Sequence, residues 1–279
     1  MPTTHPLRPG IEPYPGCRLR QLLNRTEHAE VWKAATVEER PLAVKFVSCD
    51  DQAIQHDLPF LLAVRRLNHP HLIPISWVWC YREYVVVAMD LAHGSLLDLL
   101  WIFRTEFGTP IVARQVCRYL AQAADALDFL NTRKHQIYSQ QVPLQHGNIK
   151  PSNLLLLGDK VKLTDFKYSS QASLEQAHER LAQTLRYAAP EVFHGRESDR
   201  SDQYSLAVTY CHLRGGRLPF SDIPETLDSN YVRPEPDLTM LPAAEQPIIA
   251  RALTSCPEDR WPSCGELMAR LGRVVSVEP

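Results

Sequence analysis

Apolar residues in the first part of the chain follow patterns typical of β-strands. Two strand-like segments between 17 and 46 flank a polar stretch at 24–29, and 84–89 is a β-branched run of the kind found in buried strands. Later, the apolar runs 154–157 and 161–163 are separated by a short Gly-Asp-Lys turn, which predicts a small β-hairpin. We therefore expect a β-rich first part and one further hairpin near the middle of the chain.

A helical period begins after Thr109 and Pro110, residues typical of a helix start. A shorter helix is expected to begin at Pro59, because proline is favoured in the first helical turn. In that case Asp57 precedes the body of the shorter helix. The apolar residues that recur every three or four positions in the long helix are Val112, Val116, Leu120, Ala124, Leu127 and Leu130.

Residues 1–15 contain five prolines and no apolar period. This composition predicts an extended or disordered leader, with a proline-rich docking ligand as the alternative. We place one folded domain at 16–275.

Composition narrows the class of protein. The chain has 279 residues, 44% of them hydrophobic and 22% charged, which is ordinary for a soluble globular protein. A net charge of −2 gives no sign of nucleic-acid binding. Seven cysteines without metal-type spacing indicate reduced thiols, hence a cytoplasmic protein. We expect no membrane segment, because no apolar run is long enough, and no signal peptide.

Polar residues able to bind a phosphate lie before and after the predicted hairpin. The order His-Gly-Asn-Ile-Lys-Pro-Ser-Asn at 146–153, followed by Asp-Phe-Lys at 165–167, resembles the catalytic loop and metal-binding motif of the eukaryotic-type protein kinases. Their usual form is H-R-D-x-K-x-x-N and then D-F-G. Further matches to this family follow in its order: Ala43-Val44-Lys45, His69-Pro70, Ala189-Pro190-Glu191, Asp202 and Arg260.

This resemblance implies an α+β, bilobal fold with a β-rich N-lobe of about 16–91 and a mainly helical C-lobe of about 92–275. It implies that Asn148, Lys150 and Lys45 stand at the catalytic positions. It implies that ATP contacts involve Val31, Ala43, Lys45, Met89, Asp90, Ala92, Asn153, Leu155 and Asp165, and that Asn153 and Asp165 hold Mg²⁺. It implies a structural role for His146, Phe166, Glu191, Asp202 and Arg260.

Several family positions are altered. Asn148 replaces the catalytic aspartate, and an amide accepts a hydrogen bond from a hydroxyl but does not take up its proton. Gly147 replaces the arginine that grips a phosphorylated activation loop, so control through that contact is not expected. The three positions of the phosphate-covering glycines hold Asn24, Thr26 and Ala29 instead. The alternative interpretation of that stretch is an ordinary hairpin turn without a ligand.

Two further departures concern charge. The family spacing places Phe60 where a glutamate would pair with Lys45, so this ion pair is expected to be missing unless Asp57 reaches across. Lys167 replaces the hinge glycine of D-F-G. Our hypothesis is that its ammonium points into the cleft and partly substitutes for a metal charge near Asp165, and the alternative is that it points to solvent. The stretch 131–145 is longer than in the family, as a surface loop or a partner-binding insertion.

The leading hypothesis is a pseudokinase that acts by binding a protein partner and that still holds ATP, with Mg²⁺ doubtful. The first alternative is a weak, atypical Ser/Thr protein kinase that phosphorylates a protein substrate. The second is an interaction module without nucleotide. Small-molecule phosphotransferases are a neighbouring class with a similar loop. They usually lack the A-P-E segment and the arginine that pairs with its glutamate, here Arg260.

Overall fold

The computed structural model describes residues 7–26, 28–49, 51–131, 135–137, 140–167, 183–221 and 231–276. These residues form two compact units. Within the described ranges, unit 1 consists of 7–68 and 73–92, and unit 2 consists of 69–72 and 93–276. Unit 1 is built around a β-sheet and unit 2 is mainly helical, so the predicted α+β class is confirmed.

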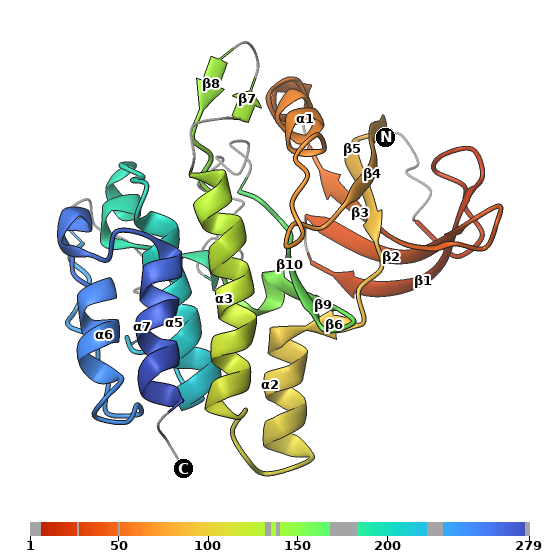
Figure 1. Cartoon of the computed structure of the whole chain (residues 1–279). Coiled ribbons are helices and arrows are strands. Elements are labelled where there is room, and N and C mark those ends of the chain that lie inside the picture. The colour runs from red at the N-terminus through yellow and green to blue at the C-terminus, as the bar shows by residue number, and fades with distance from the viewer. Residues whose placement is uncertain are drawn as a thin grey trace. The chain divides into compact units, whose positions relative to one another are not determined.

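Unit 1 contains a five-stranded antiparallel sheet in the order β1-β2-β3-β5-β4 (Figure 1). The predicted buried strand is β5, which lies between two neighbours inside the sheet. The strands are β1 (Cys17–Arg25), β2 (Ala29–Thr36), β3 (Pro41–Ser48), β4 (Ile75–Tyr81) and β5 (Tyr84–Asp90).

The core of unit 1 lies on one face of this sheet. Trp32 pairs with Val44 across β2 and β3, and Val44 pairs with Ala88 across β3 and β5. Residues that face each other across neighbouring strands share a face. These residues pack with Leu19 and Phe46 in one buried apolar cluster. Burial of this face is the main stabilising contribution within unit 1.

Residues 7–15 pack against the core instead of forming a disordered leader. Leu7 is buried in the apolar cluster. The backbone N–H of Gly10 donates to the Leu19 carbonyl, and that of Leu19 donates to the Ile11 carbonyl. Tyr14 packs on two rings of β4, and Trp79 Nε1 donates to the Pro13 carbonyl at 3.0 Å. This region is therefore an N-terminal arm of unit 1, and residues 1–6 lie outside the described residues.

The helix predicted to begin at Pro59 begins earlier. Helix α1 (Asp51–Val64) contains Pro59 in its interior. An interior proline costs about 3 kcal/mol because it removes a backbone hydrogen bond. Asp57, Leu61 and Val64 are all buried and share one side of the helix at spacings of four and three. Packing of this side stabilises the turns on both sides of the proline, a tertiary effect that the local sequence does not reveal.

Unit 2 is organised around a long helix, α3, which contacts two other helices and a strand. Its predicted core residues from Val116 to Leu130 are buried, but it begins at Ala113, and Thr109 is not its cap. Val112 is the N-cap residue and is 60% exposed. The helices are α2 (Leu96–Thr105), α3 (Ala113–Leu130), α5 (Ser201–Gly215), α6 (Gln246–Ala252) and α7 (Cys264–Val275).

A small sheet in unit 2 carries the predicted hairpin. It has the strand order β10-β9-β6, with β6 (Gly94–Ser95), β9 (Leu154–Leu157) and β10 (Lys160–Leu163). Gly158 in the turn has a φ of +62°, which glycine adopts without strain. The short 3₁₀ helices of unit 2 are Pro151–Asn153, Pro190–His194 and Pro257–Asp259.

The stretch expected to contain an insertion holds a second hairpin, formed by β7 (His135–Ile137) and β8 (Gln140–Val142). Its base is tied to the end of α3. His135 is buried, its ring packs edge-on to Phe129, and its Nε2 lies 2.8 Å from the Phe129 carbonyl oxygen. Residues 132–134 and 138–139 lie outside the described ranges.

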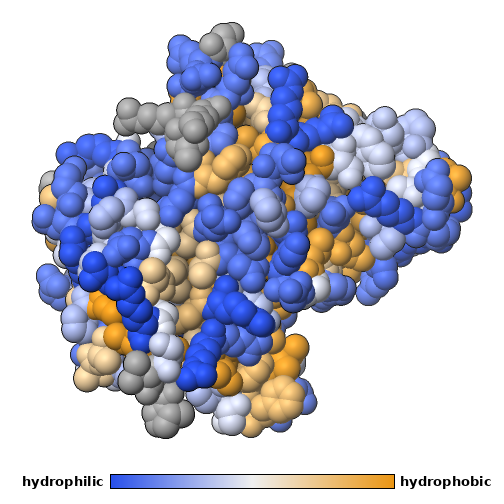
Figure 2. Space-filling view, viewed as in Figure 1, coloured by the Kyte–Doolittle hydropathy of each residue, from blue (hydrophilic) through white to orange (hydrophobic). Residues whose placement is uncertain are grey.

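Exposed apolar side chains gather on α2 and the turn that follows it. Figure 2 shows apolar surface over this part of unit 2. Exposed apolar groups of this kind, when contiguous, are typical of contact surfaces. The residues are Leu97, Trp101, Ile102, Phe107 and Val112. Among the described helices none has the length and apolar character needed to cross a membrane.

Candidate functional site

Four of the residues predicted to contact ATP share one face of the unit 1 sheet. Val31 lies opposite Lys45, and Ala43 lies opposite Met89. Ala43 and Lys45 are two positions apart on β3 and therefore point to the same side. This is the face opposite to the apolar cluster of Trp32 and Val44. The strand pairing and the pleat of β3 thus place these four predicted residues on one face of the sheet.

The predicted hinge residues follow at the end of β5. Asp90 pairs with Leu42 in the sheet, and its carboxylate accepts a hydrogen bond from Arg40 Nη2 at 2.6 Å. Its backbone N–H donates to the Pro74 carbonyl. Ala92, two residues on, is half-buried. The Asp90 side chain is therefore engaged in an ion pair within unit 1.

The stretch that replaces the phosphate-covering glycines is a tight hairpin between β1 and β2. Asn24 lies opposite Val31 in the strand pairing. The backbone N–H of Thr26 donates to the Ala29 carbonyl at 2.8 Å. The Arg25 and Glu30 side chains form an ion pair at 3.0 Å beside the turn. In its described part, this hairpin is stabilised by a backbone hydrogen bond and an ion pair between its own residues.

Lys45 and Asp57 are two buried charged side chains of unit 1. Lys45 on β3 is 8% exposed, and Asp57 in the body of α1 is 2% exposed. The prediction that Asp57 lies before the helix is wrong, because α1 begins at Asp51. Burial of a charge is costly unless an opposite charge or hydrogen bonds compensate it.

In unit 2 the catalytic loop is held by its backbone. The Asp202 carboxylate accepts hydrogen bonds from the backbone N–H groups of His146 at 2.7 Å and Gly147 at 2.9 Å. At the other end, Asn153 Nδ2 donates to the Asn148 carbonyl at 2.7 Å. Both Asp202 and Asn153 are buried. The loop is thus fixed at both ends by predicted residues.

Asn148 is bound through both ends of its amide. It is 3% exposed. Its Nδ2 donates to the Asp165 carbonyl at 3.0 Å, and its Oδ1 accepts a hydrogen bond from the Thr184 hydroxyl at 3.1 Å. The Lys150 ammonium donates to the same hydroxyl at 3.4 Å. These contacts hold the Asn148 oxygen at the Thr184 hydroxyl, which also accepts from Lys150.

Thr184 was not among the predicted site residues. The sequence contained one signal for it, namely its place in Thr184-Leu185-Arg186-Tyr187, just before Ala189-Pro190-Glu191. A threonine in a loop has many ordinary roles, so its hydroxyl became assignable only when the fold placed it beside Asn148.

The segment after β10 adopts an unusual backbone at Asp165. Its φ of +65° lies in the left-handed region, which aspartate tolerates better than most residues. Phe166 is buried with its ring 4.6 Å from that of His146. Burial lowers the pKa of His146 to about 4, although the charge of Asp165 opposes this. His146 is therefore neutral at physiological pH and acts as packing.

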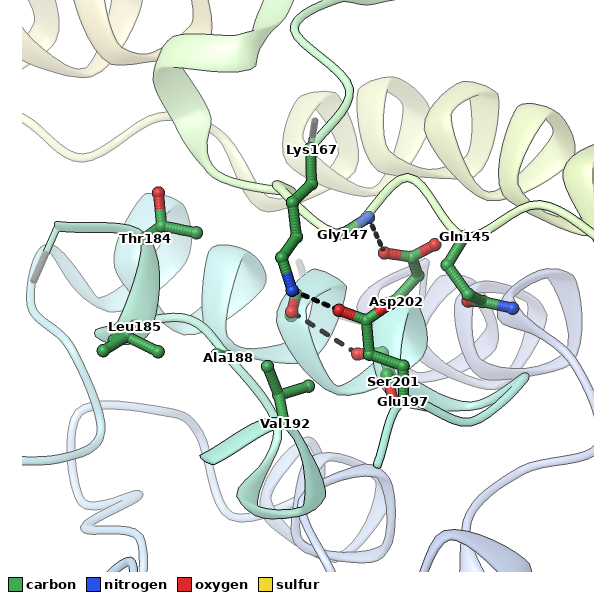
Figure 3. Close-up of a pocket in the computed structure, with 11 residues that line it drawn as sticks. Gln145, Gly147, Lys167, Thr184, Leu185, Ala188, Val192, Glu197, Ser201 and Asp202 are labelled. Atoms are coloured by element: carbon green, nitrogen blue, oxygen red, sulfur yellow. Dashed lines mark hydrogen bonds and ion pairs between the residues drawn. The ribbon is translucent and has the colours of Figure 1, made fainter. Parts of the chain in front are cut away.

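The Lys167 ammonium is engaged by a carboxylate of unit 2. Its ammonium forms an ion pair with Glu197 (Figure 3). Its aliphatic part covers Gly147, where an added Cβ would lie 3.0 Å from Lys167 Cβ and 3.1 Å from its Cδ. This pairing speaks against a metal-like role, whereas the Lys167 side chain is 36% exposed, in line with the solvent alternative. Glu197 and Lys167 attract each other as opposite charges, and both line a pocket with Asp202 and Gly147.

Charges in this pocket also affect Asp202. Burial raises the pKa of its carboxyl to about 6, while the backbone N–H groups of His146 and Gly147 lower it. The nearby Glu197 raises that pKa further, and Lys167 lowers it. The Lys167–Glu197 ion pair therefore lies next to the group that holds the catalytic loop.

The predicted structural pair in unit 2 is formed. Arg260 donates from Nη1 and Nη2 to the two carboxylate oxygens of Glu191, at 2.8 Å and 2.7 Å. The Ser201 hydroxyl donates to the same carboxylate at 2.7 Å. These bonds hold the pKa of Glu191 below its usual value despite its burial. Such a two-fold pair fixes the geometry at the end of the segment that contains Thr184.

Among the described residues no cluster of three or more His, Cys, Asp or Glu side chains could hold a metal by itself. Mg²⁺ needs no such cluster, because one or two carboxylates with phosphates and water usually bind it. Asn153 uses its Nδ2 within the loop, and its Oδ1, which accepts from the Ser152 hydroxyl, has a second lone pair. The amide oxygen of Asn153 and the carboxylate of Asp165 are donor types that a nucleotide-bound Mg²⁺ accepts. Leu155 lies on β9 opposite Ser95.

Comparisons with known proteins agree with this arrangement. A family model described as protein kinase domain matches residues 21–268. The serine/threonine-protein kinase PknF of Mycobacterium tuberculosis is 28% identical over 228 residues, covering 75% of this chain and 45% of that protein. PknH of Mycobacterium bovis is 28% identical over 264 residues, covering 89% of this chain and 42% of that protein. The chain thus spans less than half the length of these relatives.

The fold is also similar to a solved structure. The crystal structure of the M. tuberculosis PknI kinase domain has a TM-score of 0.72 and 24% identity, and the likeness covers 98% of this chain and 100% of that chain. At this identity the likeness supports the fold alone. The family match over residues 21–268, together with the ordered loop from His146 to Asp165, leads to one assignment. The chain belongs to the protein kinase family.

Proposed function

We propose that this domain is an ATP-dependent Ser/Thr protein kinase of low activity. In this proposal Asn148 orients the hydroxyl of a protein substrate without accepting its proton. The observation that carries the proposal is the arrangement of Asn148, Thr184 and Lys150, in which the buried amide oxygen is held by a hydroxyl that also contacts the lysine. A loop that had lost all role in transfer would not require this ordering.

The physical argument rests on how phosphoryl transfer is catalysed. Its transition state is loose, so positioning and charge stabilisation supply most of the rate enhancement. Loss of a general base costs a factor of about 10² to 10⁴. Kinase turnover is typically about 1–100 per second, so slow transfer remains within reach of an amide at this position. The similarity to PknF and PknH supports the same class.

Nucleotide binding would follow the roles that the family resemblance implies. In our proposal Lys45 binds the α- and β-phosphates, Asn153 and Asp165 hold Mg²⁺ on the phosphates, and Val31, Ala43 and Met89 contact the base. Mg²⁺ would supply neutralisation of the phosphate charge. The chain's own groups position the phosphates and the hydroxyl.

We further propose that Asp57 takes the part of the glutamate that pairs with Lys45 in this family. Both side chains are buried in unit 1, and Asp57 lies in the body of α1. If Asp57 stabilises the Lys45 ammonium, Asp57→Asn weakens ATP binding about as much as Lys45→Met. The double variant then adds little to either single one. Additive losses would contradict the pairing.

The second candidate is a pseudokinase that acts by binding a protein partner. One specific observation favours it, because the Asn148 amide cannot take up a proton. Lys167 in place of the hinge glycine and the absence of glycine at 24, 26 and 29 point the same way. In this case nucleotide serves as a structural ligand, or the domain works without it.

One experiment separates these functions. ATP is titrated against the purified protein with and without Mg²⁺, beside a radiolabel transfer assay on a general protein substrate. Transfer by the unmodified protein that is lost in Lys45→Ala and in Asp165→Ala supports the kinase. Binding without transfer, unchanged by Asn148→Asp, supports the pseudokinase. Absence of binding leaves an interaction module and rejects the proposed function.

A further inference from the structure

The turn that contains Thr184 is held from a distant part of the chain by Arg233. This side chain is 8% exposed. Its Nη1 donates to the Leu185 carbonyl at 3.0 Å and to the Ala188 carbonyl at 2.8 Å. Its Nη2 donates to the Arg186 carbonyl. One guanidinium thus binds three carbonyls of a single turn, directly after Thr184.

Aromatic rings pack around this guanidinium. Its carbon lies 4.4 Å from the centre of the Phe220 ring, 5.4 Å from that of Phe193 and 5.9 Å from that of Tyr204. Tyr204 belongs to α5 and stacks on Phe220. An arginine guanidinium is attracted to aromatic ring faces and can stack on them, which leaves its N–H groups free to donate. The rings therefore help to hold the Arg233 guanidinium beside the three carbonyls of the turn.

The turn itself carries the contact to the catalytic loop. Tyr187 N–H donates to the Thr184 carbonyl and Ala188 N–H to the Leu185 carbonyl, so 184–188 behaves as one small unit. Thr184, Leu185 and Ala188 line the same side of the pocket in Figure 3. The Thr184 hydroxyl reaches Asn148 Oδ1 at 3.1 Å. Displacement of the turn therefore displaces the group that orients Asn148.

We propose that Arg233 is a positioning residue for phosphoryl transfer. It acts through the 184–188 turn and Thr184 to fix the Asn148 amide, and it touches neither nucleotide nor substrate. The proposal rests on the proposed kinase function. It assigns to Arg233 a role that no catalytic motif of the sequence indicated.

The kinetic test compares Arg233→Lys with the unmodified protein. A lysine keeps the charge, but one ammonium does not reproduce the planar fork that binds three carbonyls. We expect kcat to fall about 10- to 100-fold, because displacements of about 1 Å cost up to that factor. The dissociation constant for ATP should stay unchanged. Arg217→Lys is the matched control, since Arg217 is an exposed arginine that pairs with Asp237.

A double variant tests the route through Thr184. Thr184→Val removes the hydroxyl that contacts Asn148. If Arg233 acts through this hydroxyl, Arg233→Lys in the Thr184→Val background lowers kcat by less than about threefold further. Full additivity of the two losses overturns the proposal, as does an unchanged kcat in Arg233→Lys.

A measurement independent of activity separates this proposal from the proposed function. Amide hydrogen exchange at Tyr187 and Ala188 should accelerate in Arg233→Lys, while exchange in α3 stays unchanged. Absence of transfer by the unmodified protein rejects the kinase function and with it the kinetic role. Transfer with unchanged exchange rejects only the role of Arg233. Should Arg233→Lys fail to fold, Phe220→Leu removes the nearest ring and predicts the same changes at smaller size.

Discussion

At the scale of single residues, Asn148 combines a loss and a gain. An aspartate at this place could accept a proton, but it could not donate to the Asp165 carbonyl as the amide does at 3.0 Å. The same side chain therefore supports the left-handed backbone of Asp165 and lowers the capacity for base catalysis.

This leads to a prediction for Asn148→Asp. Phosphate transfer should rise by a factor of up to about 10² to 10⁴, because a general base is restored. The free energy of unfolding should fall by about 1–3 kcal/mol, because the Asp165 carbonyl loses its donor. Radiolabel transfer and urea unfolding measure the two effects. Asn131→Asp is the matched control, since its amide also donates to a backbone carbonyl, that of Asp199. Unchanged transfer together with unchanged stability would contradict this account.

Gly147 and Lys167 form a second residue-scale unit, because the Lys167 side chain lies against the glycine. Gly147→Arg restores the family arginine but should destabilise the protein. The positive φ costs about 1–2 kcal/mol for a residue with a Cβ, and that Cβ would collide with Lys167. Gly158→Arg is the control, because its φ is also positive while its Cβ would meet no atom within 4 Å. Urea unfolding should show the larger loss for Gly147→Arg, and equal losses would refute the steric contribution.

At the scale of elements, the N-terminal arm packs against the unit 1 sheet. Tyr14 packs on Trp77 and Trp79 of β4 with ring centres 5.5 Å and 5.3 Å away. The arm thereby covers side chains of a strand at the edge of the sheet.

We therefore expect Tyr14→Ala to lower the free energy of unfolding by about 1–3 kcal/mol, since each aromatic pair contributes about 0.5–1.5 kcal/mol. Leu23→Ala, at an exposed position of β1, should change it by less than about 0.5 kcal/mol. Denaturant unfolding followed by tryptophan fluorescence measures both. Equal effects of the two substitutions would mean that the arm does not stabilise the sheet.

At the scale of the whole molecule, the buried His146 and the half-buried His212 contribute to the pH dependence of stability. Burial lowers the pKa of His146 to about 4, and burial together with Arg186 and Arg104 lowers that of His212 to about 4. Between pH 6.5 and 4 the unfolded chain binds protons that these folded side chains exclude, so stability falls as pH falls. Asp202 opposes this below pH 6, because burial raises its pKa to about 6. The loss of stability from the two histidines exceeds the gain from the Asp202 carboxyl.

The prediction is that the free energy of unfolding decreases from pH 7 to pH 4.5 and that His212→Gln makes this decrease smaller. His212 contacts the Tyr187 hydroxyl through Nδ1 at 2.8 Å, and glutamine can retain a contact there. Urea unfolding at several pH values gives the slope, and His194→Gln at an exposed position is the matched substitution. A slope in His212→Gln equal to that of the unmodified protein would exclude His212 as a contributor.

Some predictions rested on the spacing of apolar residues along the chain, and these agree with the structure. The β-branched run became β5, the two apolar runs became β9 and β10, and the helical period became α3. A period of two or of 3.6 reports which side chains share a face, and this depends only on neighbours along the chain. Exact starts were less well predicted, as at α3, because a helix end depends on caps and on packing.

Other features depended on contacts between distant residues. Pro59 lies within α1 because buried side chains on one side of that helix outweigh the local cost. The ammonium of Lys167 pairs with Glu197, thirty positions away, and the Arg233 guanidinium binds the turn after Thr184 from almost fifty positions away. A long charged side chain reaches whichever partner the fold brings near, and no local pattern encodes that partner.

The sequence by itself determined the family, the order of its motifs and the substitutions at Asn148, Gly147 and Lys167, because these are properties of residue identity and spacing. Only the tertiary structure decided what the substituted side chains do. It placed the Asn148 amide between a carbonyl and a hydroxyl, and it buried Asp57 in a helix. The physical reason is that hydrogen bonds and ion pairs act over a few ångströms, and the fold alone determines which atoms come that close.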